Sequence, residues 1–306
     1  MVLSVVIPSY RGHELTVRAV RTLGEVPIDC EVIVVDDGSG QPDRDRLMAA
    51  LPDVKVLALP DNGGFATAVN AGFRLARGTC LVALNNDAEV SWPELRKLMD
   101  FLDSNERVAA VGPALTDAAE NPAVATTPLP RPLWQKLAHP GATLRGRRTR
   151  APLPGTDPFR VDSIRGACVA FRRDALSQVG LFDEQFGMFA EDMDLCRRLG
   201  TAGWELWINP HAVTLHRGGG STRRHPTPAV AAGFRRQSHR SACRYLAKHH
   251  SLIDRVAMRG EMALRVIGRA VGAATRGDTR LAREQIGNLR TLVSPASNRP
   301  REGSLP

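Results

Sequence analysis

The sequence has few aromatic residues, few cysteines and no long uninterrupted apolar stretch. Its five cysteines are an odd number, stand far apart and form no CxxC pair, which argues against a disulfide framework and a zinc finger. Nowhere do about 18 apolar residues follow one another, the minimum for a helix that spans a bilayer. The N-terminus lacks the basic flank and cleavage site of a secretory signal. We therefore expect a cytoplasmic protein with reduced cysteines.

Two common nucleotide-binding motifs are also missing. The first predicted strand is not followed by GxGxxG, and GxxxxGK[ST] occurs nowhere in the chain. A dinucleotide-dependent dehydrogenase and a P-loop ATPase therefore lose their main support. With 306 residues, 43% of them hydrophobic and 24% charged, the chain is nevertheless long and apolar enough to bury a core.

The net charge of +9 is concentrated near the C-terminus. Residues 229–306 contain 15 basic and 5 acidic residues, a net charge of +10, which leaves the rest of the chain close to neutral. Such a segment suits an anionic surface, and phospholipid, nucleic acid and simple solubility all fit. Because Phe234 and Tyr245 are its only aromatic residues for stacking on bases, we expect no nucleic-acid partner.

Short runs rich in valine, isoleucine and leucine alternate with stretches of helical spacing in the first half of the chain. The predicted strands are 3–7, 31–35, 54–59, 80–84 and 108–111, and the predicted helices lie near 12–24, 42–51, 64–77 and 91–104. This alternation favours an α/β fold with a mostly parallel central sheet flanked by helices. In such sheets ligands bind beyond the carboxyl ends of the strands.

The pattern changes in the second half. Residues 112–159 are rich in proline and are predicted to be a long loop. Strands at 167–171 and 204–208, helices near 173–179 and 191–201, and helices near 229–250, 252–274 and 279–292 are predicted to follow. We expect one domain over 1–225, a basic C-terminal helical extension over 226–293 and a disordered tail over 294–306.

Polar residues follow four of the predicted strands. They are Pro8-Ser9-Tyr10-Arg11, Asp36-Asp37-Gly38-Ser39, Asp61-Asn62-Gly63-Gly64 and Asn85-Asn86-Asp87. We expect these groups to face one crevice. Carboxylates and amides suit a site that holds a base and ribose by hydrogen bonds and a diphosphate through a divalent cation.

Each of these residues also has a simpler explanation. Asp37 could form a turn or cap the next helix, and Asp87 could do the same after its strand. His216 precedes a glycine run and could be an ordinary surface histidine. The alternative is that Asp87 and His216 are ligands of one Mn²⁺ or Mg²⁺ ion.

Three acids occur in four positions at the predicted start of the helix near 191–201. The helix dipole tolerates Glu191, Asp192 and Asp194 there, but consecutive helical residues point about 100° apart, so one carboxylate is free to face the crevice. Asp192 is the candidate general base, because neighbouring apolar residues could partly dehydrate it and raise its pKa. Asp194 is predicted to form an ion pair with Arg197 or Arg198.

Five motifs, in this order and spacing, resemble those of the family 2 glycosyltransferases of GT-A fold. They are Val6-Ile7-Pro8-Ser9-Tyr10, Val35-Asp36-Asp37-Gly38-Ser39, Asn62-Gly63-Gly64-Phe65-Ala66 with Asn70-Ala71-Gly72, Leu84-Asn85-Asn86-Asp87, and Glu191-Asp192-Met193-Asp194-Leu195. Further motifs are similar to those of bacterial rhamnosyltransferase-type members that build cell-surface polysaccharide. They are Val169-Ala170-Phe171-Arg172-Arg173, Val179-Gly180-Leu181-Phe182-Asp183-Glu184 and Ala202-Gly203-Trp204.

The resemblance implies an inverting transfer of a sugar from a nucleotide-sugar donor to a hydroxyl of a glycan or a polyprenyl-diphosphate-linked acceptor. It implies that Asp192 is the base, that Asp87 is the metal-binding acid of the DXD motif, and that His216 completes the metal site. The nucleotide-sugar-binding residues would be Pro8, Tyr10, Asp36, Asp37, Asn62, Gly63, Asn86 and Glu191. Asn85 departs from the family pattern, since many relatives have an acid in its place.

The basic helical segment has two open explanations. Arg236, Arg240, Arg244 and Lys248 share one face of its first helix, and Ile253, Val256, Leu264, Ile267 and Val271 form an apolar stripe on the second. The segment could dock peripherally on the anionic inner face of the cell membrane, or the helices could pack back on the rest of the chain. A sugar-phosphate nucleotidylyltransferase and a nucleotide-sugar-binding protein without transferase activity are the rival functions. The oligomeric state is left open.

Overall fold

The computed structural model of the chain describes residues 2–27, 29–132, 151–218, 228–277, 279, 281, 285–287 and 289. The chain divides into two compact units. Unit 1 comprises Met1–Leu129, Arg147–Gly187 and Glu191–Ser221, and unit 2 comprises Pro130–Gly146, Met188–Ala190 and Thr222–Pro306. Two short segments from earlier in the chain join unit 2, and the domain boundary predicted at 225 stays a prediction. The predicted disordered tail at 294–306 lies outside the described residues.

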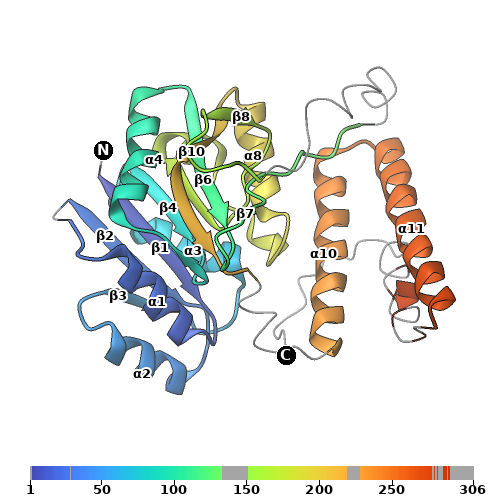
Figure 1. Ribbon diagram of the computed structural model, residues 1–306, viewed down its shortest axis with the longest axis horizontal. Helices are drawn as coiled ribbons and strands as arrows, with labels where there is room; N and C mark the ends of the chain where they lie inside the picture. The colour runs from blue at the N-terminus through green and yellow to red at the C-terminus, as the bar shows by residue number, and fades with distance from the viewer. Residues whose placement is uncertain are drawn as a thin grey trace. The chain divides into compact units, whose positions relative to one another are not determined.

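Among the described residues, ten strands form one sheet at the centre of unit 1 (Figure 1). Along its main path the strand order is β3-β2-β1-β4-β9-β6-β10-β5, with β7 paired to β6 and β8 paired to β10. The strands are β1 Leu3–Ser9, β2 Cys30–Asp36, β3 Lys55–Ala58, β4 Cys80–Leu84, β5 Ala88–Glu89, β6 Val108–Thr116, β7 Pro122–Ala123, β8 Phe159–Val161, β9 Cys168–Arg172 and β10 Glu205–His216.

The sheet combines parallel pairings with antiparallel ones. Strands β1 to β4 are parallel to one another where they pair, and so are β6 and β10, as predicted. Strand β9, however, lies between β4 and β6 and is antiparallel to both. A parallel neighbour needs a crossover connection, usually a helix, whereas β9 follows an irregular stretch, so it can return in the opposite direction.

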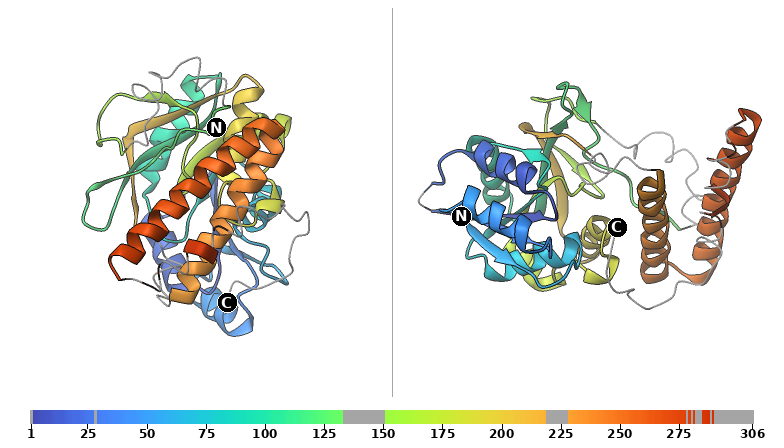
Figure 2. Two further views of the ribbon diagram at one scale, coloured as in Figure 1. Left: turned by 90° about the vertical axis from the view of Figure 1, so that its right-hand side faces the viewer. Right: turned by 90° about the horizontal axis from the view of Figure 1, so that it is seen from below.

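Helices cover both faces of the sheet, as Figures 1 and 2 show. One core joins α1 (His13–Leu23), α2 (Gln41–Ala50) and α4 (Trp92–Ser104) to alternate strand residues such as Val5 and Ile7. The other core joins α3 (Phe65–Leu75), α7 (Arg173–Val179) and α8 (Glu191–Thr201) to the residues in between, such as Val6. Because successive strand side chains point to opposite faces, a continuous apolar strand feeds both cores, and each fully buried residue of this kind contributes about 1.5–3 kcal/mol.

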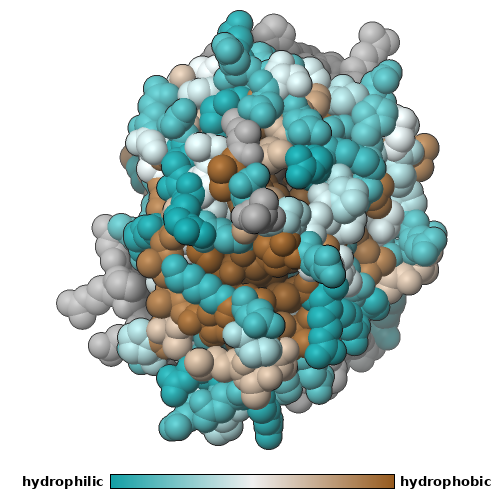
Figure 3. Space-filling view, turned by 90° about the vertical axis from the view of Figure 1, so that its left-hand side faces the viewer, coloured by the Kyte–Doolittle hydropathy of each residue, from teal (hydrophilic) through white to brown (hydrophobic). Residues whose placement is uncertain are grey.

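The sheet ends at β3, whose outer edge has no strand paired to it among the described residues. Val56 of β3 and Val54 just before it are only partly buried. Figure 3 views the molecule from the side where β2 and β3 lie in Figure 1, and apolar residues gather at the centre of this face with hydrophilic residues around them. The core is therefore incompletely covered here.

The described part of unit 2 consists mainly of the helices α10 (Pro228–His249) and α11 (Leu252–Thr275). They lie side by side and share a small apolar cluster that includes Cys243 and Val266 (Figure 2). Ser251 caps α11, because its hydroxyl accepts a hydrogen bond from the Asp254 backbone N–H at 3.2 Å. Helices among the described residues lack the combination of length and apolarity that a membrane span requires.

Candidate functional site

The carboxyl ends of β1 and β2 place Asp37 between two strands and a glycine turn. Ser9 pairs with Asp36 across the two parallel strands, and the Asp37 N–H donates to the Ser9 carbonyl at 2.8 Å. The Asp37 carboxylate then accepts one hydrogen bond from the Gly63 N–H and one from the Gly64 N–H, each at 2.8 Å. Asp37 therefore fixes the 63–64 turn against the end of β2.

The ionisation of Asp37 depends on two opposing influences. Burial raises the pKa of its carboxyl group to about 6, and the nearby Asp36 charge acts in the same direction. The two backbone N–H donors oppose this rise, because they stabilise the charged form. The net result is a pKa of about 6 for Asp37, above that of an ordinary aspartate.

Gly64 makes the turn possible and links it to the segment before α8. Its φ is +84° and its ψ is 175°, a conformation that is essentially restricted to glycine. A Cβ atom on Gly64 would lie 2.6 Å from the Gly187 carbonyl oxygen. Glycine is therefore required here both for the backbone conformation and for the close approach of a second backbone segment.

Arg11, one of the polar residues expected to face the crevice, was assigned no binding role from the sequence, yet it makes specific contacts after β1. Tyr10 is half-buried, and the Arg11 guanidinium lies 5.1 Å from the centre of its ring. Arg11 has a φ of +47°, which is uncommon for a non-glycine residue, and its N–H donates to the Ser39 hydroxyl at 2.8 Å. The Ser39 N–H in turn donates to the Asp36 carboxylate at 3.3 Å. The glycine that follows Arg11 hints at a tight turn, but the pairing with Ser39 requires the folded chain.

Asp87 and His216 meet because of a short antiparallel pairing. His216, at the end of β10, lies opposite Ala88 of β5, the residue after Asp87. His216 Nε2 is 3.2 Å from Asp87 Oδ1, and the Asp87 side chain is almost fully buried whereas that of His216 is about a quarter exposed. The two residues predicted as metal ligands are thus brought together, although 129 positions separate them.

These residues fit a hard divalent cation that is shared with a substrate. Asn85 Oδ1 is buried and has no hydrogen-bond partner among the described residues, so a further oxygen is available two positions before Asp87. In the described part of the chain, no three histidine, cysteine or acidic residues gather into a self-sufficient metal site. Magnesium and manganese sites often combine one or two protein carboxylates with phosphate oxygens of the substrate, which this donor set permits.

Glu191 and Asp192 are adjacent acids at the start of α8, of which Glu191 is buried and Asp192 is half-buried. Burial raises the pKa of both carboxyl groups, and the charge of Asp192 raises that of Glu191 further. Asp192 Oδ1 accepts the Met193 N–H at 2.7 Å, and the Gly166 N–H and the Arg165 charge also favour its ionised form. Because stabilising donors reach Asp192, it is the member of the pair better suited to exist as a carboxylate.

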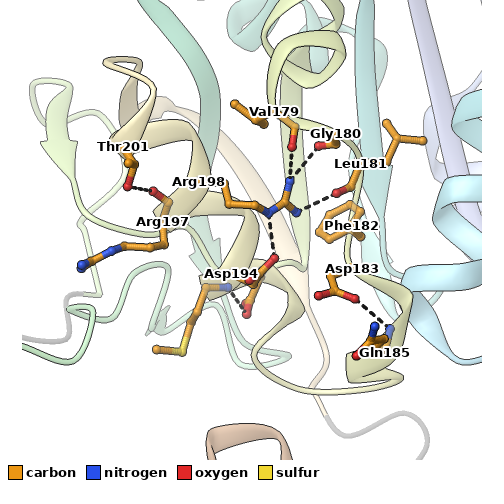
Figure 4. Close-up of polar contacts among 12 residues, drawn as sticks. Val179, Gly180, Leu181, Phe182, Asp183, Gln185, Asp194, Arg197, Arg198 and Thr201 are labelled. Carbon is orange, nitrogen blue, oxygen red and sulfur yellow. Dashed lines mark hydrogen bonds and ion pairs between the residues drawn. The ribbon is translucent and has the colours of Figure 1, made fainter. Parts of the chain in front are cut away.

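Asp194 has a different role, shown in Figure 4. Its carboxylate is completely buried and accepts a hydrogen bond from Arg198 Nε at 2.8 Å, which confirms the predicted ion pair. The same guanidinium donates to the carbonyl oxygens of Val179, Gly180 and Leu181. The neighbouring Arg197 side chain points away from the carboxylate. We call Asp194, Arg198 and these three carbonyl groups the Arg198 cluster.

Short backbone contacts connect the base candidate to the metal-site candidates. Asp192 is in contact with Gly166, and the carbonyl of the next residue, Ala167, accepts the Asn85 N–H at 2.9 Å. On the other side, the buried Thr16 hydroxyl donates to the Ser9 hydroxyl at 2.7 Å and accepts the Asn86 amide at 3.4 Å. The ends of β1, β2 and β4 and the start of α8 therefore border one region of unit 1. Pro8, near the end of β1, and Asn62, shortly before α3, are half-buried.

Comparison with known proteins gives a consistent family assignment. The sequence profile of the family described as "Glycosyl transferase family 2" matches residues 4–180. The chain is 30% identical over 261 residues to an N-acetylglucosaminyl-diphospho-decaprenol L-rhamnosyltransferase of Mycobacterium tuberculosis, covering 76% of this chain and 81% of the relative. It is 33% identical over 187 residues to a pre-mycofactocin glycosyltransferase of the same species, covering 60% of this chain and 37% of that protein.

Solved structures share the fold at low sequence identity. A mannosyltransferase from Pyrobaculum calidifontis, in complex with GDP-Man and Mn²⁺, has a TM-score of 0.55 and 18% identity, covering 95% of this chain and 85% of its own. GalNAc-T7, with UDP, GalNAc and Mn²⁺, has a TM-score of 0.52 and 19% identity, covering 78% of this chain and 47% of its own. The predicted GT-A type of α/β fold is thereby confirmed.

Proposed function

The chain belongs to glycosyl transferase family 2, and from this premise we propose that it transfers a rhamnosyl or related sugar with inversion to a lipid-linked glycan acceptor. Its activity as a glycosyltransferase of glycan biosynthesis follows from the family. This assignment favours transfer over the nucleotidylyltransferase and the binding protein without activity that the sequence analysis left open. The inversion, the sugar, the acceptor and the residue roles are the proposed part.

The position of Asp192 is the observation that carries the proposal. A half-buried carboxylate at a helix start, with a raised pKa and with N–H donors that favour its ionised form, can accept a proton from a substrate hydroxyl. The acceptor hydroxyl would transfer its proton to Asp192 as its oxygen bonds to the anomeric carbon. The bond from that carbon to the nucleoside diphosphate would break on the opposite side, which inverts the anomeric centre.

We place the nucleotide at the ends of β1 and β2. Asp36, Asp37 and the Gly63 turn form a rigid polar edge there, and the half-buried Tyr10 ring provides an apolar surface beside it. These groups would bind the base and ribose of the donor, together with Pro8 and Asn62. Asn86 and Glu191 would lie nearer the sugar and the diphosphate.

We also propose that a divalent metal ion, Mn²⁺ or Mg²⁺, assists the reaction. Asp87 and His216 would hold it, with Asn85 Oδ1 as a further donor. When bound, the metal would neutralise negative charge on the departing diphosphate. The residues of the chain would orient the donor and would remove the acceptor proton.

The M. tuberculosis relative supports a proposal for the acceptor and for the location of the protein. Its name states a decaprenol-linked diphosphate substrate, and the two proteins match over most of both chains. We therefore propose a polyprenyl-diphosphate-linked acceptor and a peripheral position at the inner face of the cell membrane. The partners are then the nucleotide-sugar donor, the lipid-linked acceptor and the membrane surface.

A donor screen followed by a transfer assay tests this function. We expect one of dTDP-rhamnose, UDP-hexoses or GDP-mannose to raise the melting temperature when Mn²⁺ is present. That donor should then be transferred to N-acetylglucosamine linked through diphosphate to a short prenyl chain. Asp192→Asn should reduce turnover about a hundredfold or more, the usual scale of general base catalysis. Asp174→Asn, a control aspartate in the first turn of α7, should leave turnover unchanged. Equal turnover of the two variants would refute the role of Asp192.

The metal proposal has a test that does not require turnover. Calorimetry with a nucleoside diphosphate should show binding that strengthens on addition of Mn²⁺ in the wild-type protein. His216→Gln should lose about tenfold or more of this Mn²⁺-dependent affinity, since it removes a metal ligand. His211→Gln alters an exposed histidine of the same strand and should retain the affinity. An identical Mn²⁺ effect in both variants would show that His216 is not a ligand.

A further inference from the structure

Helix α11 has apolar residues on two opposite sides. On one side, Met258, Val266 and Ala273 are buried, and Val266 packs with Cys243 of α10. The outer face of α11, as we call the other side, consists of Ile253, Val256, Leu264, Ile267 and Val271. These side chains are 43% to 73% exposed. A helix needs only one apolar side to pack on its neighbour, and most of the outer face is left exposed in the described part of the chain.

The outer face is a continuous stripe. At 100° per residue its five members fall within an arc of about 80°, and Gly260 lies in the same arc. The charged residues of α11 lie outside this arc. Arg259 lies on one side of it, and the Glu261–Arg265 ion pair, with a 2.6 Å contact, lies on the other. Long arginine side chains beside an apolar stripe can reach towards a polar surface while the stripe itself is buried.

An apolar groove extends the outer face towards the C-terminus. The groove has a volume of about 320 Å³, and Ile267 and Val271 line it together with Ile286 and Leu289. Gln285 is the polar residue in its lining. Ile286 is itself 53% exposed. The exposed apolar surface is therefore larger than one helix stripe, and patches of this kind mark sites that bind a protein or a membrane.

The positive charge of the helices favours a membrane over a second copy of the chain as the partner of the outer face. Residues 228–275, which form α10 and α11, include nine basic and two acidic residues, a net charge of +7. A second copy of the chain would bring the same positive charge to the interface, which opposes association. An anionic lipid surface attracts the charge and also buries the apolar stripe. We propose that the outer face of α11 inserts shallowly into the interfacial region of an anionic lipid bilayer.

This inference deepens the proposed function, because a lipid-linked acceptor is located at a membrane. It identifies the docking surface and the lipid class, and it does not depend on the reaction. Vesicles without donor or acceptor test docking alone, whereas a water-dispersible short-chain acceptor tests transfer alone. Failure of one can thus be distinguished from failure of the other.

The experiment is sedimentation of the full-length protein with vesicles of phosphatidylcholine and phosphatidylglycerol, compared with phosphatidylcholine alone. We expect the wild-type protein to bind the anionic vesicles at least about tenfold more tightly, with an affinity that falls as salt is added. The double variant Ile253→Gln/Leu264→Gln should bind about tenfold or more weakly, since two apolar side chains no longer enter the lipid. Val256→Gln/Val271→Gln, on the same face, should behave in the same way. All four positions are exposed, so helix content measured by circular dichroism should be retained.

Leu153→Gln is the matched control, because Leu153 is a 60% exposed leucine of unit 1 and should leave vesicle binding unchanged. Equal binding of both double variants and of this control would overturn the proposal, as would equal binding of the wild-type protein to neutral vesicles. Light scattering without vesicles tests whether a second copy of the chain occupies the outer face instead. A wild-type dimer that the double variants convert to monomer would show that the outer face is a subunit interface.

Discussion

Replacing Arg198 with methionine should strongly destabilise unit 1. The guanidinium neutralises Asp194, whose side chain is completely buried, and it also donates to three carbonyl groups where the chain leaves α7. Methionine retains most of the apolar stem and removes every donor. The Arg198 side chain of α8 thus connects its own helix with the end of α7 and the turn that follows it (Figure 4).

The loss of stability can be estimated from the polar groups that Arg198→Met leaves without their partner. An uncompensated buried carboxylate costs about 3–5 kcal/mol. The three carbonyl groups add less, because Arg198 is partly exposed and water can replace some of its hydrogen bonds. We therefore expect Arg198→Met to lower the free energy of unfolding by about 4 kcal/mol. Arg198→Lys should lower it by about half as much, since one ammonium group keeps the charge but cannot span all the acceptors.

Urea unfolding followed by tryptophan fluorescence is a suitable assay. The Trp204 indole donates to Gln178 of α7 at 2.8 Å, so its emission reports on the α7–α8 region. Arg197→Met is the matched control, because that side chain points away from the Arg198 cluster, and we expect a loss below about 1 kcal/mol. If Arg198→Met is no more destabilising than Arg197→Met, the reasoning about the buried carboxylate is wrong. In Asp194→Asn/Arg198→Met the loss should be smaller than the sum of the single losses.

Three further predictions concern the candidate site. In thermal unfolding, Gly64→Ala should destabilise the protein by about 2 kcal/mol more than Gly40→Ala. Both glycines have a positive φ, but only at Gly64 would the added Cβ lie 2.6 Å from a backbone oxygen, that of Gly187. Equal losses of stability in the two variants would contradict this contact. The pH profile of kcat/KM should fall on the acid side with a midpoint above the ordinary aspartate value of 3.8, because burial raises the pKa of Asp192 and only its ionised form accepts a proton; a midpoint at or below that value would exclude Asp192 as the titrating base. Asp37 has a pKa of about 6 in the folded chain, so the folded state binds its proton more tightly than the unfolded state between about pH 4 and 6. The stability of the wild-type protein relative to Asp37→Asn should therefore decrease as pH rises through this window, by about 2 kcal/mol after allowance for solvent screening, and then level off; a difference that increases with pH would have the wrong sign.

Local sequence patterns were sufficient to predict only part of the candidate site. The polar residues after β1, β2 and β4 could be recognised in the sequence, because a strand that ends in aspartate, asparagine and glycine has a short-range signature. The close approach of His216 to Asp87 was predicted as an alternative and from the family resemblance, because no local pattern around either residue contains the pairing of β10 with the two-residue strand β5 that brings them together. The Arg11 contact with Ser39 was missed for a similar reason. The catalytic and binding roles of these residues stay predictions until the assays are done.

The apolar periodicity and the turn residues of the sequence determined where strands and helices form, and the predicted bounds 80–84 and 173–179 agree with β4 and α7. This was possible because the formation of a helix or a strand depends on the alternation of apolar and polar residues over only a few positions. The tertiary structure alone decided that β9 is antiparallel, that Arg198 rather than Arg197 neutralises Asp194, and that the apolar stripe of α11 is exposed. Each of these outcomes depends on which distant segment supplies the hydrogen bonds, the opposite charge or the covering surface, and a local pattern contains no information about its partner.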